Sequence, residues 1–204
     1  MKIKDYKLFL ESNFFDDRTF SLESTSINTI CRYYSITNYT INEDETVDVD
    51  GDVNLYRRKL TKLPLKFGKV TGYFNCSENQ LTTLEGSPKW VGGYFSCYNN
   101  KLTTLEGGPV TVIDGYYCYD NKLINFKGFP EDYDLYVKFN FSQPHIWHIF
   151  HGNPVFKLFG PIPFEKWDKF IYWCNEYDAI DNDGKVIPER MEEVYQKLGL
   201  EYED

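Results

Sequence analysis

The feature that most constrains the fold of this chain is a 21-residue repeat in its middle. Three cysteines, Cys76, Cys97 and Cys118, lie 21 residues apart, and the segments around them are nearly interchangeable. A fixed period of about 20 to 50 residues is typical of solenoids, because each repeat cannot bury its apolar face alone and must stack on its neighbours. The repeat therefore predicts one continuous domain of stacked coils. Aligned on cysteine, the segments read VTGYFNCSENQLTTLEGSPKW, VGGYFSCYNNKLTTLEGGPVT and VIDGYYCYDNKLINFKGFPED.

The order of residues within one repeat predicts a short strand, a bend and an extended return. An aromatic residue lies two positions before each cysteine, so both side chains face the same side of a strand. An asparagine three positions after the cysteine can bond the backbone of adjacent coils and so form a ladder. Gly86 and Pro88 then indicate a turn and a polyproline-like return segment instead of a helix. The inward-facing positions of the first clear repeat are Phe74, Cys76, Asn79, Leu81 and Leu84.

Weaker copies of the pattern flank the three clear repeats. On the N-terminal side Val53 occupies a strand position, but Arg58 stands where the asparagine is expected, so the ladder should begin one coil later. On the C-terminal side, residues 133–139 continue the strand pattern before Pro144 replaces the expected leucine. The predicted array has about five coils and covers residues 47–143.

The FxCxxNxLxxL pattern resembles the leucine-rich repeat, with Phe and Cys at two of the usual leucine positions. Its short period and LTTLEGxP segment are similar to the leucine-rich-repeat effectors that pathogenic bacteria secrete. They resemble more closely the small leucine-rich-repeat proteins encoded by tailed bacteriophages, and this resemblance extends to residues 38–55 and 151–159. It implies an α+β solenoid with a parallel sheet on its concave face. It also implies a host protein as partner, such as a defence or regulatory factor in the cytoplasm of the infected cell.

Atypical segments must cover the apolar cross-section at each end of a solenoid. Residues 1–46 and 144–204 are therefore predicted to form helical caps. In the N-terminal cap, SLESTSINTICRYYSI has apolar residues at helical spacing, and NYTIN reads as a strand. In the C-terminal cap, residues 163–180 predict an aromatic-rich helix, and residues 188–200 predict a final helix that begins near a proline and ends near a glycine. Three of the four tryptophans lie in this cap, which makes it a second candidate contact surface.

Strand residues between the inward positions face outward, and many of them are tyrosines. Tyrosine combines a large contact area, a low entropic cost of ordering and a polar tip, so we interpret this face as a surface for binding another protein. The alternative is that tyrosine favours strands and that neighbouring rings stack for local stability. The candidate partner-binding residues are Tyr56, Tyr73, Tyr94, Tyr98, Tyr117, Tyr119, Asp120 and Tyr136.

Two other groups of side chains raise the question of metal binding. His145, His148 and His151 have helical spacing, and the alternative function is a small-ligand-sequestering or metal-dependent protein built on them. Histidines alone leave a zinc site short of its usual four ligands, so we expect no metal and no cofactor. The repeat cysteines should form a ladder of free thiols in the core, because in-register strands place them in a row. The chain has no phosphate-binding loop and no nucleophile motif, which predicts a non-enzymatic protein.

Charge and composition limit the partners and the compartment. A net charge of −9 and a pI near 4.9 disfavour binding to nucleic acid, which depends on Lys and Arg. Acidic mimicry of nucleic acid is a weaker alternative, because the acidic residues are interspersed with lysines. No apolar run is long enough to span a membrane. Five cysteines, three of them at repeat positions, and no signal peptide predict a cytoplasmic protein with free thiols.

Overall fold

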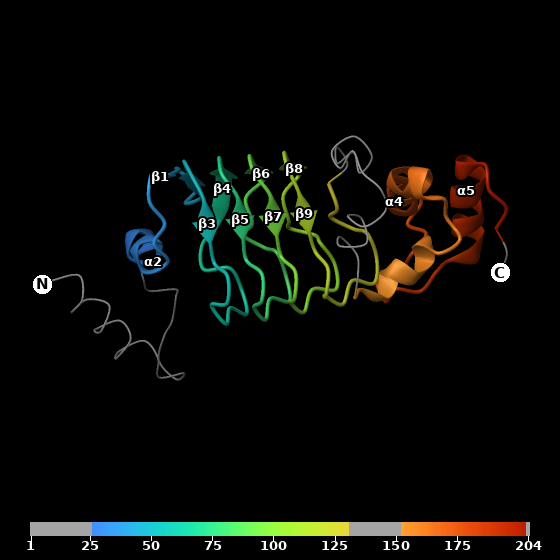
Figure 1. The fold of residues 1–204 in the computed structure, drawn as a ribbon, viewed down its shortest axis with the longest axis horizontal. Coiled ribbons are helices and arrows are strands. Elements are labelled where there is room, and N and C mark those ends of the chain that lie inside the picture. Colours follow the sequence, from blue (N-terminus) through green and yellow to red (C-terminus); the bar gives the residue numbers. More distant parts are fainter. Residues whose placement is uncertain (1–25, 131–151, 203–204) are drawn as a thin grey trace, which may run out of the picture.

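The repeats form a β-solenoid, and helices lie beyond both ends of the stacked strands (Figure 1). The computed structural model describes residues 26–130 and 152–202. Helix α2 (Ile27–Tyr33) precedes the strands, and α4 (Trp167–Glu176) and α5 (Pro188–Leu198) follow them. Two 3-10 helices, η2 (Pro154–Phe159) and η3 (Phe164–Lys166), lead into α4.

Two sheets run along the solenoid, and each coil contributes one short strand to each of them. All pairings between coils are parallel, and β1 alone pairs antiparallel, with β2. The first sheet has the order β1 (Tyr39–Ile41), β2 (Val47–Val49), β4 (Phe67–Val70), β6 (Trp90–Val91) and β8 (Thr111–Val112). The second has the order β3 (Val53–Asn54), β5 (Phe74–Asn75), β7 (Phe95–Ser96) and β9 (Tyr116–Tyr117).

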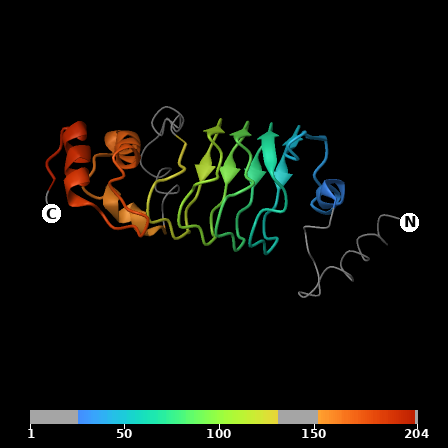
Figure 2. The same ribbon diagram turned by 180° about the vertical axis from the view of Figure 1, so that it is seen from behind.

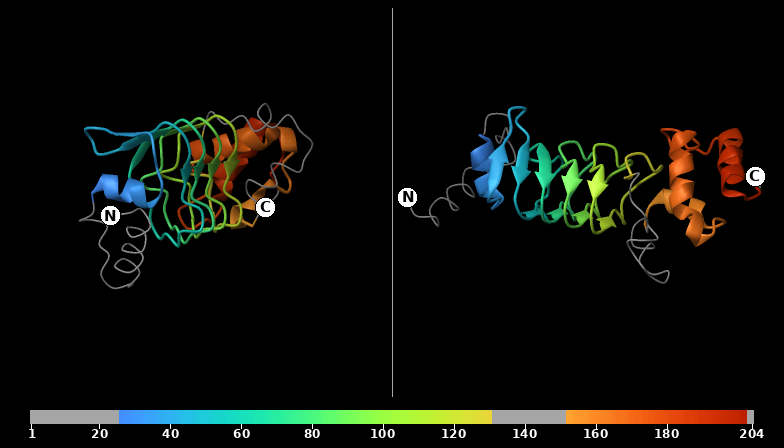
Figure 3. Two further views of the ribbon diagram at one scale, coloured as in Figure 1. Left: turned by 60° about the vertical axis from the view of Figure 1, so that its left-hand side comes forward. Right: turned by 90° about the horizontal axis from the view of Figure 1, so that it is seen from above.

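The register of the second sheet reproduces the period of the sequence. Val53 pairs with Phe74, Phe74 with Phe95, and Phe95 with Tyr116. Each step is 21 residues, so equivalent side chains form columns along the stack. The view from behind and the view turned toward the stack show the coils repeating one shape (Figures 2 and 3). The predicted solenoid, its period and its parallel strands are confirmed.

The first sheet differs from the sequence-based expectation, which placed only an extended return segment before each Phe/Cys strand. Val70, Val91 and Val112 are buried there and pair in register. These valines also recur every 21 residues, so the signal was present but limited to strands of two to four residues.

A bend at Gly92 then turns the chain into the second sheet. A Cβ on Gly92 would lie 2.1 Å from the carbonyl oxygen of Thr71, so only glycine allows this close approach.

The interior of the solenoid consists of apolar columns with no exposed surface. Phe74 and Phe95 stack with their ring centroids 5.7 Å apart, and Tyr116 continues the column at 5.0 Å from Phe95. Stacked aromatic pairs add to the stability that burial of their area provides. The fully buried aliphatic and thiol positions of the coils are Val47, Val53, Leu55, Val70, Cys76, Leu81, Leu84, Val91, Cys97, Leu102, Leu105, Cys118 and Leu123.

A ladder of asparagines connects the coils at the bend that follows the second sheet. The Asn100 side-chain oxygen accepts a hydrogen bond from the Leu81 amide at 2.9 Å. Its amide group donates to the carbonyl oxygens of Cys76 and Cys97 at 3.1 and 3.0 Å. Asn79 and Asn121 make the equivalent bonds one coil before and one coil after. The ladder therefore begins at Asn79, one coil after Arg58, as predicted.

The ladder continues to Asn153, which the 21-residue period did not identify. Asn153 accepts from the Leu123 amide at 3.1 Å and donates to the Cys118 carbonyl oxygen at 3.1 Å. It lies 32 residues after Asn121, which is 11 more than one repeat. Gly152, just before it, has a φ of 72°, and the residues before the other ladder asparagines also have positive φ. Because 11 additional residues precede Asn153, a search for asparagines at a fixed 21-residue period does not find this ladder position.

The helices outside the solenoid agree with the expected elements where the structure describes them. Helix α5 begins at Pro188 and ends at Leu198, and the next residue, Gly199, caps it with a φ of 65°, the left-handed conformation that favours glycine. Phe170 on α4 packs against Phe126 of the last described coil and Tyr195 of α5. The predicted continuation at residues 133–139 lies outside the described residues.

Replacing Asn100 with alanine should destabilise the protein by about 3 kcal/mol, because a buried amide and buried carbonyl groups lose their partner. Chemical denaturation followed by circular dichroism measures this change in the free energy of unfolding. The control is Thr82→Ala, an exposed side chain of the same bend region, which should change that free energy by less than about 0.5 kcal/mol. Equal effects of the two variants would show that the ladder does not hold the coils together.

Candidate functional site: a tyrosine-lined face

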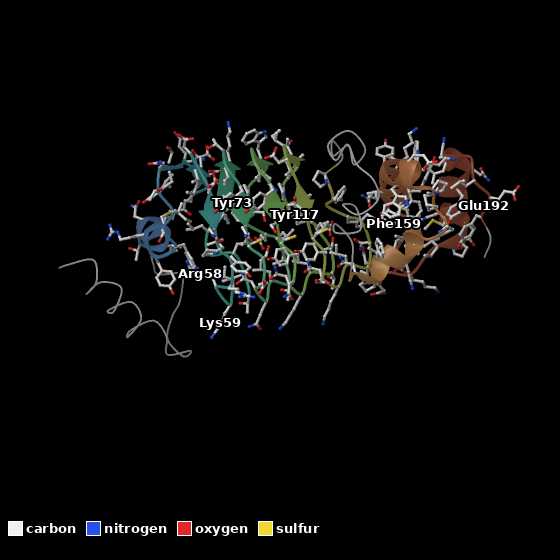
Figure 4. All side chains as sticks on the ribbon, viewed as in Figure 1. Arg58, Lys59, Tyr73, Tyr117, Phe159 and Glu192 are labelled. Atoms are coloured by element: carbon white, nitrogen blue, oxygen red, sulfur yellow. The ribbon has the colours of Figure 1, made fainter. Side chains whose placement is uncertain are left out.

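Six of the eight candidate residues are tyrosines that the structure brings together on one side of the solenoid. They come from four successive coils and border the second sheet, where Figure 4 labels Tyr73 and Tyr117. All six are half-buried, so each ring both packs on the protein and contacts solvent. We call this surface the tyrosine-lined face, formed by Tyr56, Tyr73, Tyr94, Tyr98, Tyr117 and Tyr119.

Neighbouring tyrosines of this face stack ring against ring. Tyr73 and Tyr94 have centroids 4.8 Å apart and an interplanar angle of 2°. Tyr98 and Tyr119 have centroids 4.5 Å apart and an angle of 5°. Rings this close leave no room for a ligand between them, so a partner would meet ring edges and hydroxyl groups. The stacking that the sequence offered as an alternative is present, and it determines which atoms a partner can reach.

Tyr117 fills a gap in the first tyrosine column. The 21-residue repeat places Gly115 where Tyr73 and Tyr94 stand in the preceding coils. A Cβ on Gly115 would lie 2.9 to 3.0 Å from atoms of the Tyr117 ring, so that ring lies over the glycine. From there it makes an edge contact with Tyr94 at 6.0 Å. The column therefore stays aromatic although its third member comes from another position of the repeat.

The second column has a polar interruption. Ser77 stands where the other coils have Tyr56, Tyr98 and Tyr119, and it is fully buried. The next residue, Glu78, has a carboxylate that accepts a hydrogen bond from the Tyr56 hydroxyl at 2.6 Å.

Three donors from neighbouring coils hold this carboxylate. Besides Tyr56, the Arg57 Nε donates to Glu78 at 2.5 Å, and the Tyr98 hydroxyl lies 3.5 Å away. These bonds lower the pKa of Glu78, and the bond from Tyr56 has the largest effect, followed by the bond from Arg57. The bond to Glu78 in turn raises the pKa of Tyr56 to about 12. The carboxylate is therefore ionised at neutral pH, and its charge is matched by Arg57.

The sequence placed Arg57 and Glu78 among the outward-facing strand residues but did not include them in the candidate partner-binding residues. The available signal was that the second coil reads SENQ where the others read YRRK, YNNK and YDNK. Asp120 is exposed at the last described coil, beside Gly152. Burial raises the pKa of Tyr119, and the charge of Asp120 contributes a smaller increase. Tyr136, His145, His148 and His151 lie outside the described residues.

The cysteine ladder has the character of a core and not of a reactive site. All five cysteines are free and buried, as expected. Burial raises the pKa of Cys76, Cys97 and Cys118, so these thiols stay protonated at neutral pH. Within residues 26–130 and 152–202, no three His, Cys, Asp or Glu side chains gather in a way that could hold a metal ion.

Comparison with models of known protein families, with curated proteins and with solved structures gave no match. Among the helices that the structure describes, none combines the length and apolar character needed to cross a membrane.

The buried thiols predict that stability falls at alkaline pH. In the unfolded chain each cysteine has the ordinary thiol pKa of about 8.5. Above that pH the unfolded state therefore loses protons that the folded state keeps. Well above that pKa, the free energy of unfolding should decline by about 1.4 kcal/mol per pH unit for each buried thiol. Between about pH 8.5 and 9.5, below the titration of tyrosine, the unfolded thiol is only partly ionised, and the decline for each thiol should be about 1 kcal/mol. Denaturant titrations over this interval should show a decline that is smaller by about 1 kcal/mol for Cys97→Ala than for the wild type. Identical slopes would contradict the prediction.

Proposed function

We propose that this chain is a non-enzymatic protein-interaction module that binds a partner protein through its tyrosine-lined face. The observation that carries the proposal is the gathering of six half-exposed tyrosines from four coils on one side of the solenoid. The proposed architecture is a leucine-rich-repeat array of about five coils, with this face on its concave side and helical caps at both ends. Asn153 supports a further coil beyond the three clear repeats, because it occupies a ladder position.

Pre-organisation of the rings supports binding as their role. A free tyrosine loses side-chain entropy when a partner orders it, but stacked rings such as Tyr98 and Tyr119 are already ordered. A partner then gains contact area and hydrogen bonds to the hydroxyl groups at low entropic cost. The paired charges of Arg57 and Glu78 also reduce the electrostatic penalty of covering this face.

The resemblance to bacteriophage-encoded leucine-rich-repeat proteins extends the proposal to the identity of the partner. We propose a host protein, such as a defence or regulatory factor, and action in the cytoplasm of the infected cell. Five free, buried thiols are consistent with a reducing compartment.

Affinity capture from host lysate tests the proposal with a variant that the chain itself suggests. Because Ser77 occupies the same column in the second coil, Tyr98→Ser combined with Tyr119→Ser should be tolerated by the fold. The wild type should retain a protein, identified by mass spectrometry, whose direct affinity for the double variant falls at least about tenfold. Circular dichroism establishes that the variant is folded.

Tyr172→Ser is the matched control, because Tyr172 is 46 % exposed on α4, away from the repeats. It should bind the captured protein as the wild type does. Equal affinity of the double variant and the wild type would remove the tyrosine-lined face as the site. Loss with Tyr172→Ser alone would place the contact on the C-terminal helices instead.

A further inference from the structure

A second surface with a different chemistry runs along the turn edge of the solenoid. It consists of four equivalent segments, residues 59–62, 80–83, 101–104 and 122–125, which we call the lysine edge. Together these segments contain no Asp and no Glu, although the chain as a whole carries a net charge of −9. The four cationic side chains of the lysine edge are Lys59, Lys62, Lys101 and Lys122.

The repeat itself aligns these side chains. Lys59, Gln80, Lys101 and Lys122 are spaced by 21 residues and follow directly after the asparagine position of each coil. The residue that follows each of them is a buried leucine. The backbone amides of two of these leucines, Leu81 and Leu102, donate to ladder asparagines, which fixes the backbone at this point of the coil. The lysines of this column are exposed, and Figure 4 shows Lys59 extending away from the coils. The column is therefore a regular row of cations on a rigid support.

The lysine edge has no counter-charge of its own. Among the described residues, the ion pairs join Arg57 to Glu78 and Lys127 to Asp178, and neither involves the edge. The ammonium group of Lys101 donates to the Gln80 side-chain oxygen at 3.2 Å, a neutral partner. Like charges held in a row repel one another, and an anionic partner would relieve that repulsion.

We propose that the lysine edge binds an acidic polypeptide segment that lies extended along the solenoid axis. Neighbouring coils are about 4.8 Å apart, so Lys59 and Lys122 are separated by about 14 Å along the stack. In an extended peptide the side chains of one face recur about every 6.6 Å, and two or three carboxylates therefore fit this length. Exposed threonine hydroxyls beside the lysines, such as those of Thr82 and Thr103, can donate further hydrogen bonds.

A nucleic acid fits the same charges less well. Its phosphates extend far beyond about 14 Å, so most of a longer polyanion would lie outside the row of lysines. A short acidic peptide matches the length of the row.

The lysine edge adds to the proposed function and does not depend on it. The second coil, which lacks the tyrosine of the other coils at Ser77, also lacks their lysine at Gln80. Packing does not require that a coil without the tyrosine also lack the lysine, because the Gln80 position is exposed. The experiment below leaves all the tyrosines unchanged, so its failure would not affect the tyrosine-lined face.

Fluorescence anisotropy with a labelled eight-residue peptide of alternating Glu and Thr tests the proposal at low salt. The triple variant Lys59→Gln, Lys101→Gln and Lys122→Gln should bind this peptide about tenfold more weakly than the wild type. The control variant Lys157→Gln, Lys169→Gln and Lys185→Gln changes the net charge equally on exposed positions outside the repeats. It should bind like the wild type, and the matching Gln/Thr peptide should not bind.

A gain of affinity provides a second readout that does not rely on removing groups. Gln80→Lys completes the row of lysines and should tighten peptide binding about twofold to threefold. Gln196→Lys, an exposed position on α5, makes the same chemical change and should have no effect. Absence of binding by the wild type, or equal losses in both triple variants, would overturn the proposal. Tighter binding of a single-stranded oligonucleotide of equal charge would show that the partner class is wrong.

Discussion

The hydrogen bonds of the ladder asparagines are the interaction on which the rest of this structure depends. Each coil bends sharply after its second strand, and the bend leaves backbone amide and carbonyl groups inside the protein. A single buried side chain such as Asn100 satisfies groups from two adjacent coils. Because an unpaired buried polar group costs about 1–3 kcal/mol, this arrangement sets the register between coils. All the surface columns follow from that register.

The two proposed contact surfaces are both consequences of the stacking distance. Strands about 4.8 Å apart place equivalent tyrosines within stacking distance of each other, which hides the ring faces and leaves the hydroxyl edges exposed. The same spacing aligns lysines at the turn edge. The second coil breaks both columns, with Ser77 and Gln80, and Glu78 draws Tyr56 and Arg57 of the previous coil into one cluster.

Much of this could be predicted from the sequence, because a strict period relates each residue to its neighbour in space. The inward set, the ladder and the outward tyrosines all follow from three aligned segments. The first sheet was missed because strands as short as Trp90–Val91 carry too little pattern to recognise. Asn153 was missed because an 11-residue insertion displaces it from the period. Its hydrogen bonds to the Leu123 amide and the Cys118 carbonyl oxygen identify it as a member of the ladder.

The sequence by itself determined the period, the solenoid and the strand positions that carry the outward tyrosines, although Ser77 and Ser96, which it also placed outward, are buried. The tertiary structure decided how those side chains meet. That Tyr117 lies over Gly115, that Tyr98 stacks on Tyr119, and that Glu78 accepts bonds from the previous coil depend on rotamers and contacts between coils. A repeat specifies which residues are neighbours, but only packing specifies which of their atoms remain exposed to a partner.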